Sequence, residues 1–141
     1  MTPYTLSIDD APGSDVFRAL GDGLTQHALP YTGAPGFQPL AALLRDERGE
    51  LVGGAAGHVN WTWLSIGLVW VAEHLRRGGH GRRLIDAIED AARQRGCRHA
   101  HLDTFSYQAR PFYERLGYEL FATLDDYPPG YKRYFLRKSL G

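Results

Sequence analysis

The chain has 141 residues, 43% of them hydrophobic and 23% charged, a composition typical of one globular domain spanning residues 1–141. Its 16 basic and 16 acidic residues cancel, which argues against a nucleic-acid partner held through phosphate contacts. No apolar run is long enough to span a membrane, the first ten residues do not have the pattern of a signal peptide, and the single Cys97 excludes an intrachain disulfide, so we expect a cytoplasmic protein with no membrane partner.

The N-terminal quarter carries signals for a strand, a helix and a loop. Tyr4–Ile8 alternates like a short strand. Ser14 has the residue type of an N-cap and precedes a run with helical spacing. The apolar positions of this expected helix are Val16, Phe17, Leu20 and Leu24. His27–Phe37 contains two prolines and two glycines, which predicts a loop.

Three strands are expected next. Leu40–Arg45 and Leu51–Asn60 are separated by the turn-forming residues 46–49, which predicts a hairpin. The second strand contains Gly53, Gly54 and Gly57, and glycines inside a strand indicate bends or close approach of another backbone. Trp63–Val71 is rich in aromatic and β-branched residues and predicts the third strand.

The second half of the chain predicts two helices and three strands. Gly79–Arg95 is the clearest helix: an apolar stripe runs from Leu84 to Ala92, and polar residues, Glu89 among them, occupy the rest of its surface. The other elements are a strand Arg98–Phe105, a short helix Gln108–Leu116, and closing strands Tyr118–Leu124 and Tyr131–Arg137. The order predicts a mixed α/β fold with one sheet.

A glycine-rich loop joins the third strand to the long helix. The first amides of a helix have no internal partner and its dipole favours an anion, so this loop predicts a pyrophosphate site. Arg76, Arg77 and Arg82 add positive charge there. A dinucleotide-binding fingerprint would need a third glycine where Leu84 stands, and a Walker loop would need Gly-Lys followed by Ser or Thr, so neither pattern is met.

Two segments resemble the motifs of the GNAT acyltransferases. Residues 71–81 contain the arginine, glycine, glycine spacing of the acetyl-CoA signature at Arg76, Gly79 and Gly81. Residues 109–118 resemble the family's second motif, a helix with Phe112 and Tyr113 before a strand that starts with glycine and an aromatic residue. The resemblance implies the GNAT fold: a mostly antiparallel sheet of six to seven strands, flanked by helices and splayed centrally to hold acetyl-CoA.

The same resemblance implies roles for individual residues. Strand residues would pair with the pantetheine arm, loop residues would hold the pyrophosphate, and Ser106 stands where relatives often carry a cofactor-binding asparagine. The implied cofactor contacts are Val69, Val71, Arg76, Arg77, Gly78, Gly79, His80, Gly81, Arg82 and Ser106. Tyr113 would lie beside the sulfur and protonate the departing thiolate.

The general base is open among Glu73, Asp103 and His101, which shares a face of the strand with Asp103 if alternation holds. Glu73 follows the third strand directly, and Asp103 precedes the end of the strand on the other side of the expected cleft, where it would act through a water. Either carboxylate also fits a purely structural role. His99 and His101 have no third ligand at a convincing spacing, so we expect no metal.

We expect an enzyme that acetylates a primary amine of a small molecule by direct attack in a ternary complex. Two alternatives remain within the fold, a protein N-terminal or lysine acetyltransferase and a non-catalytic acyl-CoA sensor; a nucleotide-binding protein is a third reading. The candidate walls of the acceptor pocket are Tyr31, Phe37, Trp61, Trp63, Trp70 and the loop 127–129. Pairing of strand edges would allow a homodimer, but no residue pattern requires one.

Overall fold

The structure is a computed structural model that describes residues 3–141. It divides into two compact units, with the boundary between Pro35 and Gly36, and each unit is described by itself. Across residues 3–141, no helix combines the length and hydropathy that crossing a bilayer requires.

In its described residues, the N-terminal unit contains one helix, α1 (Ser14–Thr32). The structure of this unit differs from the sequence-based predictions at three points. Gly13 rather than Ser14 occupies the N-cap position. The predicted loop is helical as far as Thr32, with Pro30 inside the helix, and Gly33 N–H closes the last turn on the Leu29 carbonyl at 3.0 Å. Tyr4–Ile8 is not a strand: these residues have no regular secondary structure and lie outside the six-stranded sheet.

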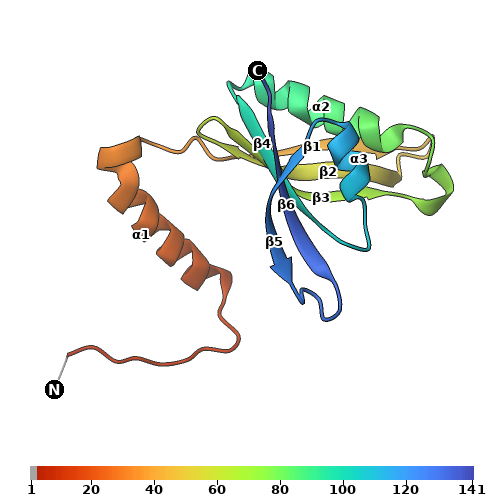
Figure 1. The fold of residues 1–141 in the computed structure, drawn as a ribbon. Helices are drawn as coiled ribbons and strands as arrows, with labels where there is room; N and C mark the ends of the chain where they lie inside the picture. Colours follow the sequence, from red (N-terminus) through yellow and green to blue (C-terminus); the bar gives the residue numbers. More distant parts are fainter. Residues whose placement is uncertain (1–2) are drawn as a thin grey trace. The chain divides into compact units, whose positions relative to one another are not determined.

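The C-terminal unit is a six-stranded sheet with helices against it. Its elements are β1 (Gln38–Arg45), β2 (Leu51–Asn60), β3 (Trp63–Val71), the 3₁₀ turn η1 (Glu73–Leu75), α2 (His80–Gln94), β4 (His99–Phe105), α3 (Arg110–Arg115), β5 (Glu119–Asp125) and β6 (Lys132–Ser139). The strand order is β1-β2-β3-β4-β6-β5, and every neighbouring pair is antiparallel except β3 with β4 (Figure 1). This arrangement confirms the predicted fold class.

The glycines of β2 allow the neighbouring backbones to approach closely, as predicted. A Cβ on Gly57 would lie 1.8 Å from the Ser65 carbonyl oxygen, so no other residue fits there without moving β3. The pairing register skips one residue beside this point: Ala56 pairs with Leu68, and Gly57 pairs with Ile66. The residue left over between them is Gly67, which therefore forms a β-bulge in the middle of β3.

The core lies between the sheet and α2. Figure 1 shows α2 lying along one face of the sheet, and its stripe of Leu84, Ile85, Ile88 and Ala92 is buried there. Glu89 was expected on the helix surface, but its side chain is only 1% exposed. Tyr118 and Lys138 donate hydrogen bonds to it at 2.7 and 2.8 Å, and these partners explain how a carboxylate can be buried here.

The parallel pair β3 and β4 separates halfway along its length. The two strands pair only from Trp63 with His99 to Ile66 with Leu102. Beyond this point β3 stays paired with β2 as far as Val71, and β4 stays paired with β6 as far as Phe105. The strands part directly beside the bulge at Gly67, so the sheet opens into the cleft that positions the candidate site.

Candidate active site

The turn between β3 and α2 leaves a set of helix amides free. The first described backbone bond inside α2 runs from Arg83 N–H to the Gly79 carbonyl at 3.2 Å, so the amides of His80, Gly81 and Arg82 have no partner within the helix. Gly79 caps the helix in the left-handed conformation with φ of 80°. Free amides at the positive end of a 15-residue helix attract an anion.

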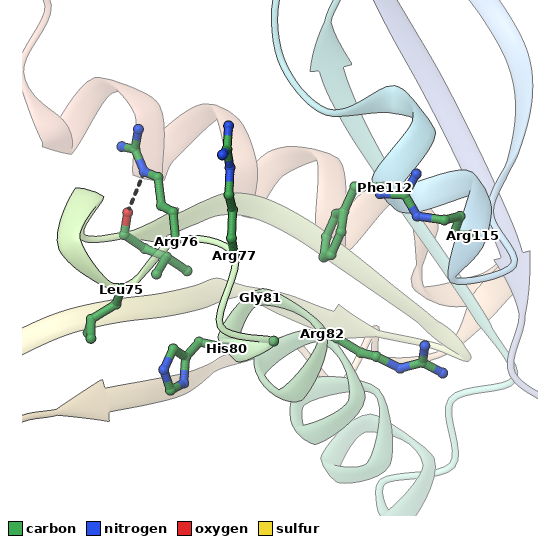
Figure 2. A pocket seen from close by; sticks show the side chains of 10 residues that line it. Leu75, Arg76, Arg77, His80, Gly81, Arg82, Phe112 and Arg115 are labelled. Carbon is green, nitrogen blue, oxygen red and sulfur yellow. Dashed lines mark hydrogen bonds between the residues drawn. The ribbon is translucent and has the colours of Figure 1, made fainter.

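A hollow of about 410 Å³ lies in front of these amides. We call it the arginine hollow, and its lining is Val71, Leu75, Arg76, Arg77, Gly79, His80, Gly81, Arg82, Phe112 and Arg115. Figure 2 shows Phe112 and Arg115 projecting from α3, and the other labelled side chains coming from the loop and the first turn of α2. Four arginines and no carboxylate make this lining strongly positive, which suits a multiply charged anion.

Close packing fixes the shape of the arginine hollow. A Cβ on Gly81 would lie 3.2 Å from the Phe112 ring, so glycine there lets α3 approach α2. Arg76 donates a hydrogen bond from Nε to the Val71 carbonyl at 3.1 Å, the dashed line in Figure 2. This bond ties the loop to the end of β3, so the loop is held in one arrangement.

Arg77 has a strained backbone conformation. A glycine at this position should make the fold more stable and, at the same time, weaken anion binding. Its φ of 68° lies in the left-handed region, which glycine adopts without steric cost. Arg77→Gly is therefore expected to raise the free energy of unfolding by about 1 kcal/mol and to weaken binding of inorganic pyrophosphate, because one positive charge is lost. Urea unfolding and calorimetric titration measure the two effects. Arg77→Ala is the matched control, and an equal gain in stability from alanine would contradict this explanation.

A second hollow, of about 270 Å³, occupies the place where β3 and β4 part. We call it the strand cleft, and its lining is Ile66, Gly67, Leu68, Val69, Leu102, Asp103, Thr104, Phe105, Gln108, Ala109 and Tyr113. Val69 lines the strand cleft and Val71 lines the arginine hollow, so the two hollows follow the same strand; the two valines are about 7 Å apart along it. Beyond Ile66 this edge of β3 is unpaired in the described part of the chain.

Tyr113 brings a protonated hydroxyl to the strand cleft. Its side chain is buried, yet no described residue hydrogen-bonds its hydroxyl, and no fully buried side-chain polar atom of the described residues lacks a partner. The hydroxyl must therefore reach the open space of the cleft. Burial, with a smaller contribution from the Asp103 carboxylate, raises the pKa of Tyr113 to about 12. At neutral pH the group is a proton donor and not a base.

Asp103 lines the same cleft and is held by an arginine. Arg133 donates from Nε to Asp103 Oδ2 at 2.9 Å, and both side chains are partly buried. The second carboxylate oxygen has no described protein donor. On the same strand, burial and the neighbouring His58 lower the pKa of His101, and Asp103 opposes them. The imidazole is therefore held towards its neutral form.

The structure brings most of the predicted site residues together. Val71, Arg76, Arg77, Gly79, His80, Gly81 and Arg82 line the arginine hollow, and Val69, Asp103 and Tyr113 line the strand cleft. Gly78 lies in the same loop without lining either hollow. Glu73 is exposed in η1 and lines neither, so its role as a base stays a prediction.

Ser106 lines neither hollow and is used within the protein instead. Its amide donates to the Lys132 carbonyl at 2.8 Å, and its Oγ accepts the Lys132 N–H at 3.0 Å. Its contact with a cofactor stays a prediction. Gln108, two residues further on, lines the strand cleft; its amide oxygen accepts from Thr104 Oγ1 and Phe105 N–H, which leaves its NH₂ group for a ligand.

Sequence reasoning missed Gln108 and Arg115 as site residues, and it named Phe112 as part of a motif without giving it a role in the site. Arg115 follows Phe112 by three positions in α3, so the two residues share one side of that helix. That spacing could have identified Arg115 once Phe112 was assigned to the site. The sequence contains no comparable signal for Gln108. Over residues 3–141 the structure has no group of three or more His, Cys, Asp or Glu side chains placed to hold a metal ion.

Comparison with known proteins gives a consistent family assignment. The model of the acetyltransferase (GNAT) family matches residues 15–118. A blasticidin-S acetyltransferase from Streptomyces morookaense is 47% identical over 95 residues, 67% of this chain and 70% of that protein. An acetyltransferase from Agrobacterium fabrum is 29% identical over 131 residues, 93% of this chain and 96% of that protein. The crystal structure of an acetyltransferase from Bacillus cereus superposes with a TM-score of 0.83 at 26% identity, covering 94% of this chain and 97% of that one.

Proposed function

The chain belongs to the acetyltransferase (GNAT) family, and from this premise we propose that it transfers an acetyl group from acetyl-CoA to a primary amine of a small molecule. The transfer is a direct attack within a ternary complex of the enzyme and both substrates. The observation that carries the proposal is the pair of hollows along β3: one at Val71 that is lined by four arginines, and one at Val69 that is lined by the buried Tyr113.

The arginine hollow fits the diphosphate of acetyl-CoA. A diphosphate is a multiply charged anion, and this hollow offers free helix amides together with four guanidinium groups. A bound diphosphate would direct the pantetheine arm along the unpaired edge of β3, where backbone groups of Val69 and Val71 can pair with its amides as an added strand would. The thioester would then reach the strand cleft.

The strand cleft supports acyl transfer with no covalent enzyme intermediate. The amine nitrogen forms a bond to the thioester carbonyl carbon, and the carbon–sulfur bond breaks as the intermediate collapses. Tyr113 donates its proton to the departing sulfur and regains one from solvent, and its raised pKa keeps it protonated until that moment. Before the attack, the ammonium loses one proton through a water to a carboxylate, so the neutral amine is the nucleophile. After the attack, the nitrogen loses a second proton to solvent and the product is the neutral amide.

Asp103 is the carboxylate that we favour as the base, because it lines the strand cleft and has one oxygen free of protein donors. Arg133 holds the other oxygen, so the free oxygen is kept in a fixed place. Glu73, in η1 after the end of β3, remains the alternative.

A small-molecule acceptor is supported by one relative. That protein is named for acetylating blasticidin-S, and it is 47% identical over 67% of this chain. We therefore propose that the acceptor of this chain is also an amine of a small molecule. A protein N-terminus or a lysine is the second candidate acceptor, and a sensor that only binds acyl-CoA is the third reading.

The test is a panel of amines with acetyl-CoA, in which release of the free thiol is measured. We expect at least one small amine to stimulate release, and mass spectrometry to find its acetylated product. Stimulation by peptide amines alone would favour the protein acetyltransferase. Binding of acetyl-CoA with no stimulation by any amine would favour the sensor and reject catalysis.

A further inference from the structure

Three tyrosines gather beside the strand cleft from two separate segments. Tyr107 follows β4, while Tyr127 and Tyr131 belong to the hairpin between β5 and β6. We call these three the tyrosine rim. Tyr107 and Tyr131 meet edge to face, with ring centroids 5.1 Å apart and planes at 80°. Their side chains are 56% and 49% exposed, and Tyr127 is 46% exposed, so large aromatic surfaces stay in contact with solvent.

The rim is joined to the strand cleft through Phe105. This residue lines the cleft, and its ring stacks on Tyr107 at 5.6 Å with planes 4° apart. The same ring also stacks on Tyr127, with centroids 6.0 Å apart. A molecule that extends out of the cleft past Phe105 therefore meets the rim.

Hydrogen bonds of the backbone, to carbonyl and to side-chain oxygens, hold the two segments in place. The turn after β4 is tied to β6 by the two bonds between Ser106 and Lys132. Within the hairpin, Tyr131 N–H donates to the Pro128 carbonyl at 2.9 Å and Gly130 N–H donates to Asp126 Oδ1 at 3.1 Å. The rim is therefore organised before any ligand arrives, which reduces the entropy lost on binding.

Among residues 3–141, the guanidinium that contacts the rim is already engaged by a carboxylate. Arg133 bonds to Asp103 and lies 5.0 Å from the centroid of the Tyr127 ring. Among the described residues, no other cation–π contact involves a rim tyrosine. The rim therefore presents aromatic faces and hydroxyls and no unpaired positive charge, so an anionic group has little to bind there.

Resting on the proposed function, we propose that the tyrosine rim binds a flat aromatic or heteroaromatic ring of the acceptor while the amine on that ring's side chain enters the strand cleft. The perpendicular arrangement of Tyr107 and Tyr131 forms a corner that offers one ring face and one ring edge. A planar ring fits such a corner with stacked and edge-to-face contacts together, and a saturated ring of equal size does not.

The test compares 2-phenylethylamine with 2-cyclohexylethylamine at saturating acetyl-CoA. The two amines bury similar areas, so their difference isolates the aromatic contribution. We expect kcat/KM to be about two- to tenfold higher for the aromatic amine, the range of measured aromatic pair energies. The double variant Tyr107→Leu/Tyr131→Leu keeps apolar bulk and should remove this preference without changing the KM for acetyl-CoA.

Phe121→Leu is the matched control. Its ring is 47% exposed and lies under Arg137 at 5.3 Å, but it lines neither the strand cleft nor the rim. This variant should keep the full preference for the aromatic amine. Equal kcat/KM for the two amines in the wild type, or a preference that survives in the double variant, would overturn the inference while leaving acetyl transfer in place.

A readout that needs no turnover separates this inference from the proposed function. Saturation-transfer NMR is recorded on 2-phenylethylamine with the wild type and coenzyme A. If the ring protons are saturated with the wild type but not with the double variant, the tyrosine rim binds the ring. This result supports the inference even if no amine is acetylated, and in that case only the proposed function fails. Absence of ring saturation in the wild type overturns the inference.

Discussion

Tyr113→Phe is expected to lower kcat about a hundredfold or more, the usual contribution of a positioned general acid. The substitution removes one hydroxyl that has no described protein partner and leaves the buried ring in place. The fold should therefore be unchanged, and acetyl-CoA should bind with unchanged affinity. Stopped-flow detection of thiol release gives kcat, and calorimetry gives the affinity.

The matched control for Tyr113 is Tyr134→Phe. Tyr134 is half-buried on β6 beneath Arg110, and it does not line the strand cleft. Loss of its hydroxyl should leave turnover unchanged. Because the pKa of Tyr113 is about 12, its ionisation should not limit turnover until the pH approaches that value. Equal turnover in the Tyr113→Phe variant and the wild type would exclude Tyr113 as the acid.

Glu89→Ala is expected to cause the largest loss of stability, about 3–5 kcal/mol in the free energy of unfolding. The carboxylate accepts from Tyr118 at 2.7 Å and from Lys138 at 2.8 Å, in a place where it is almost fully buried. Without it, the Lys138 ammonium and the Tyr118 hydroxyl stay largely buried with no acceptor. Urea unfolding of both proteins measures the difference.

Asp90→Ala is the control on the same helix. Asp90 pairs with Arg93 at 2.6 Å, but both side chains are exposed, and exposed pairs contribute about 1 kcal/mol or less. Its removal should change stability little. A loss as large as that of Glu89→Ala would mean that any charge on α2 matters equally and that burial of Glu89 is not the cause.

The parts of the fold that the sequence predicted are those with a strong local pattern. The bounds of β2 and β3 are those predicted, because turn-forming residues precede β2 and because β3 is rich in aromatic and β-branched residues. The Gly79 loop and the helix after it were predicted for a related reason. Their glycine spacing and apolar stripe are local features that need no knowledge of distant contacts.

The errors lie where the pattern is ambiguous or the partner is distant in sequence. Residues 27–32 read as a loop because of their composition, yet the helix continues through Pro30. Glu89 read as a surface residue because its partners, Tyr118 and Lys138, lie 29 and 49 positions away. No helical-wheel argument on α2 alone could find them.

The residues of the candidate site were also predictable only where they are close together in the sequence. The glycines and arginines of the loop were found from sequence because they are contiguous. Asp103 and Tyr113 could be named separately, but that they line one cleft follows from the parting of β3 and β4 beside Gly67. The tie between Asp103 and Arg133 depends on the register of β4 with β6, which no sequence pattern gives.

A crystal structure of the protein with coenzyme A tests the central claim most directly. The account predicts the diphosphate in the arginine hollow, within hydrogen-bond distance of the first amides of α2, and the sulfur in the strand cleft beside the Tyr113 hydroxyl. A diphosphate bound elsewhere, or a sulfur that lies outside the cleft, would contradict it.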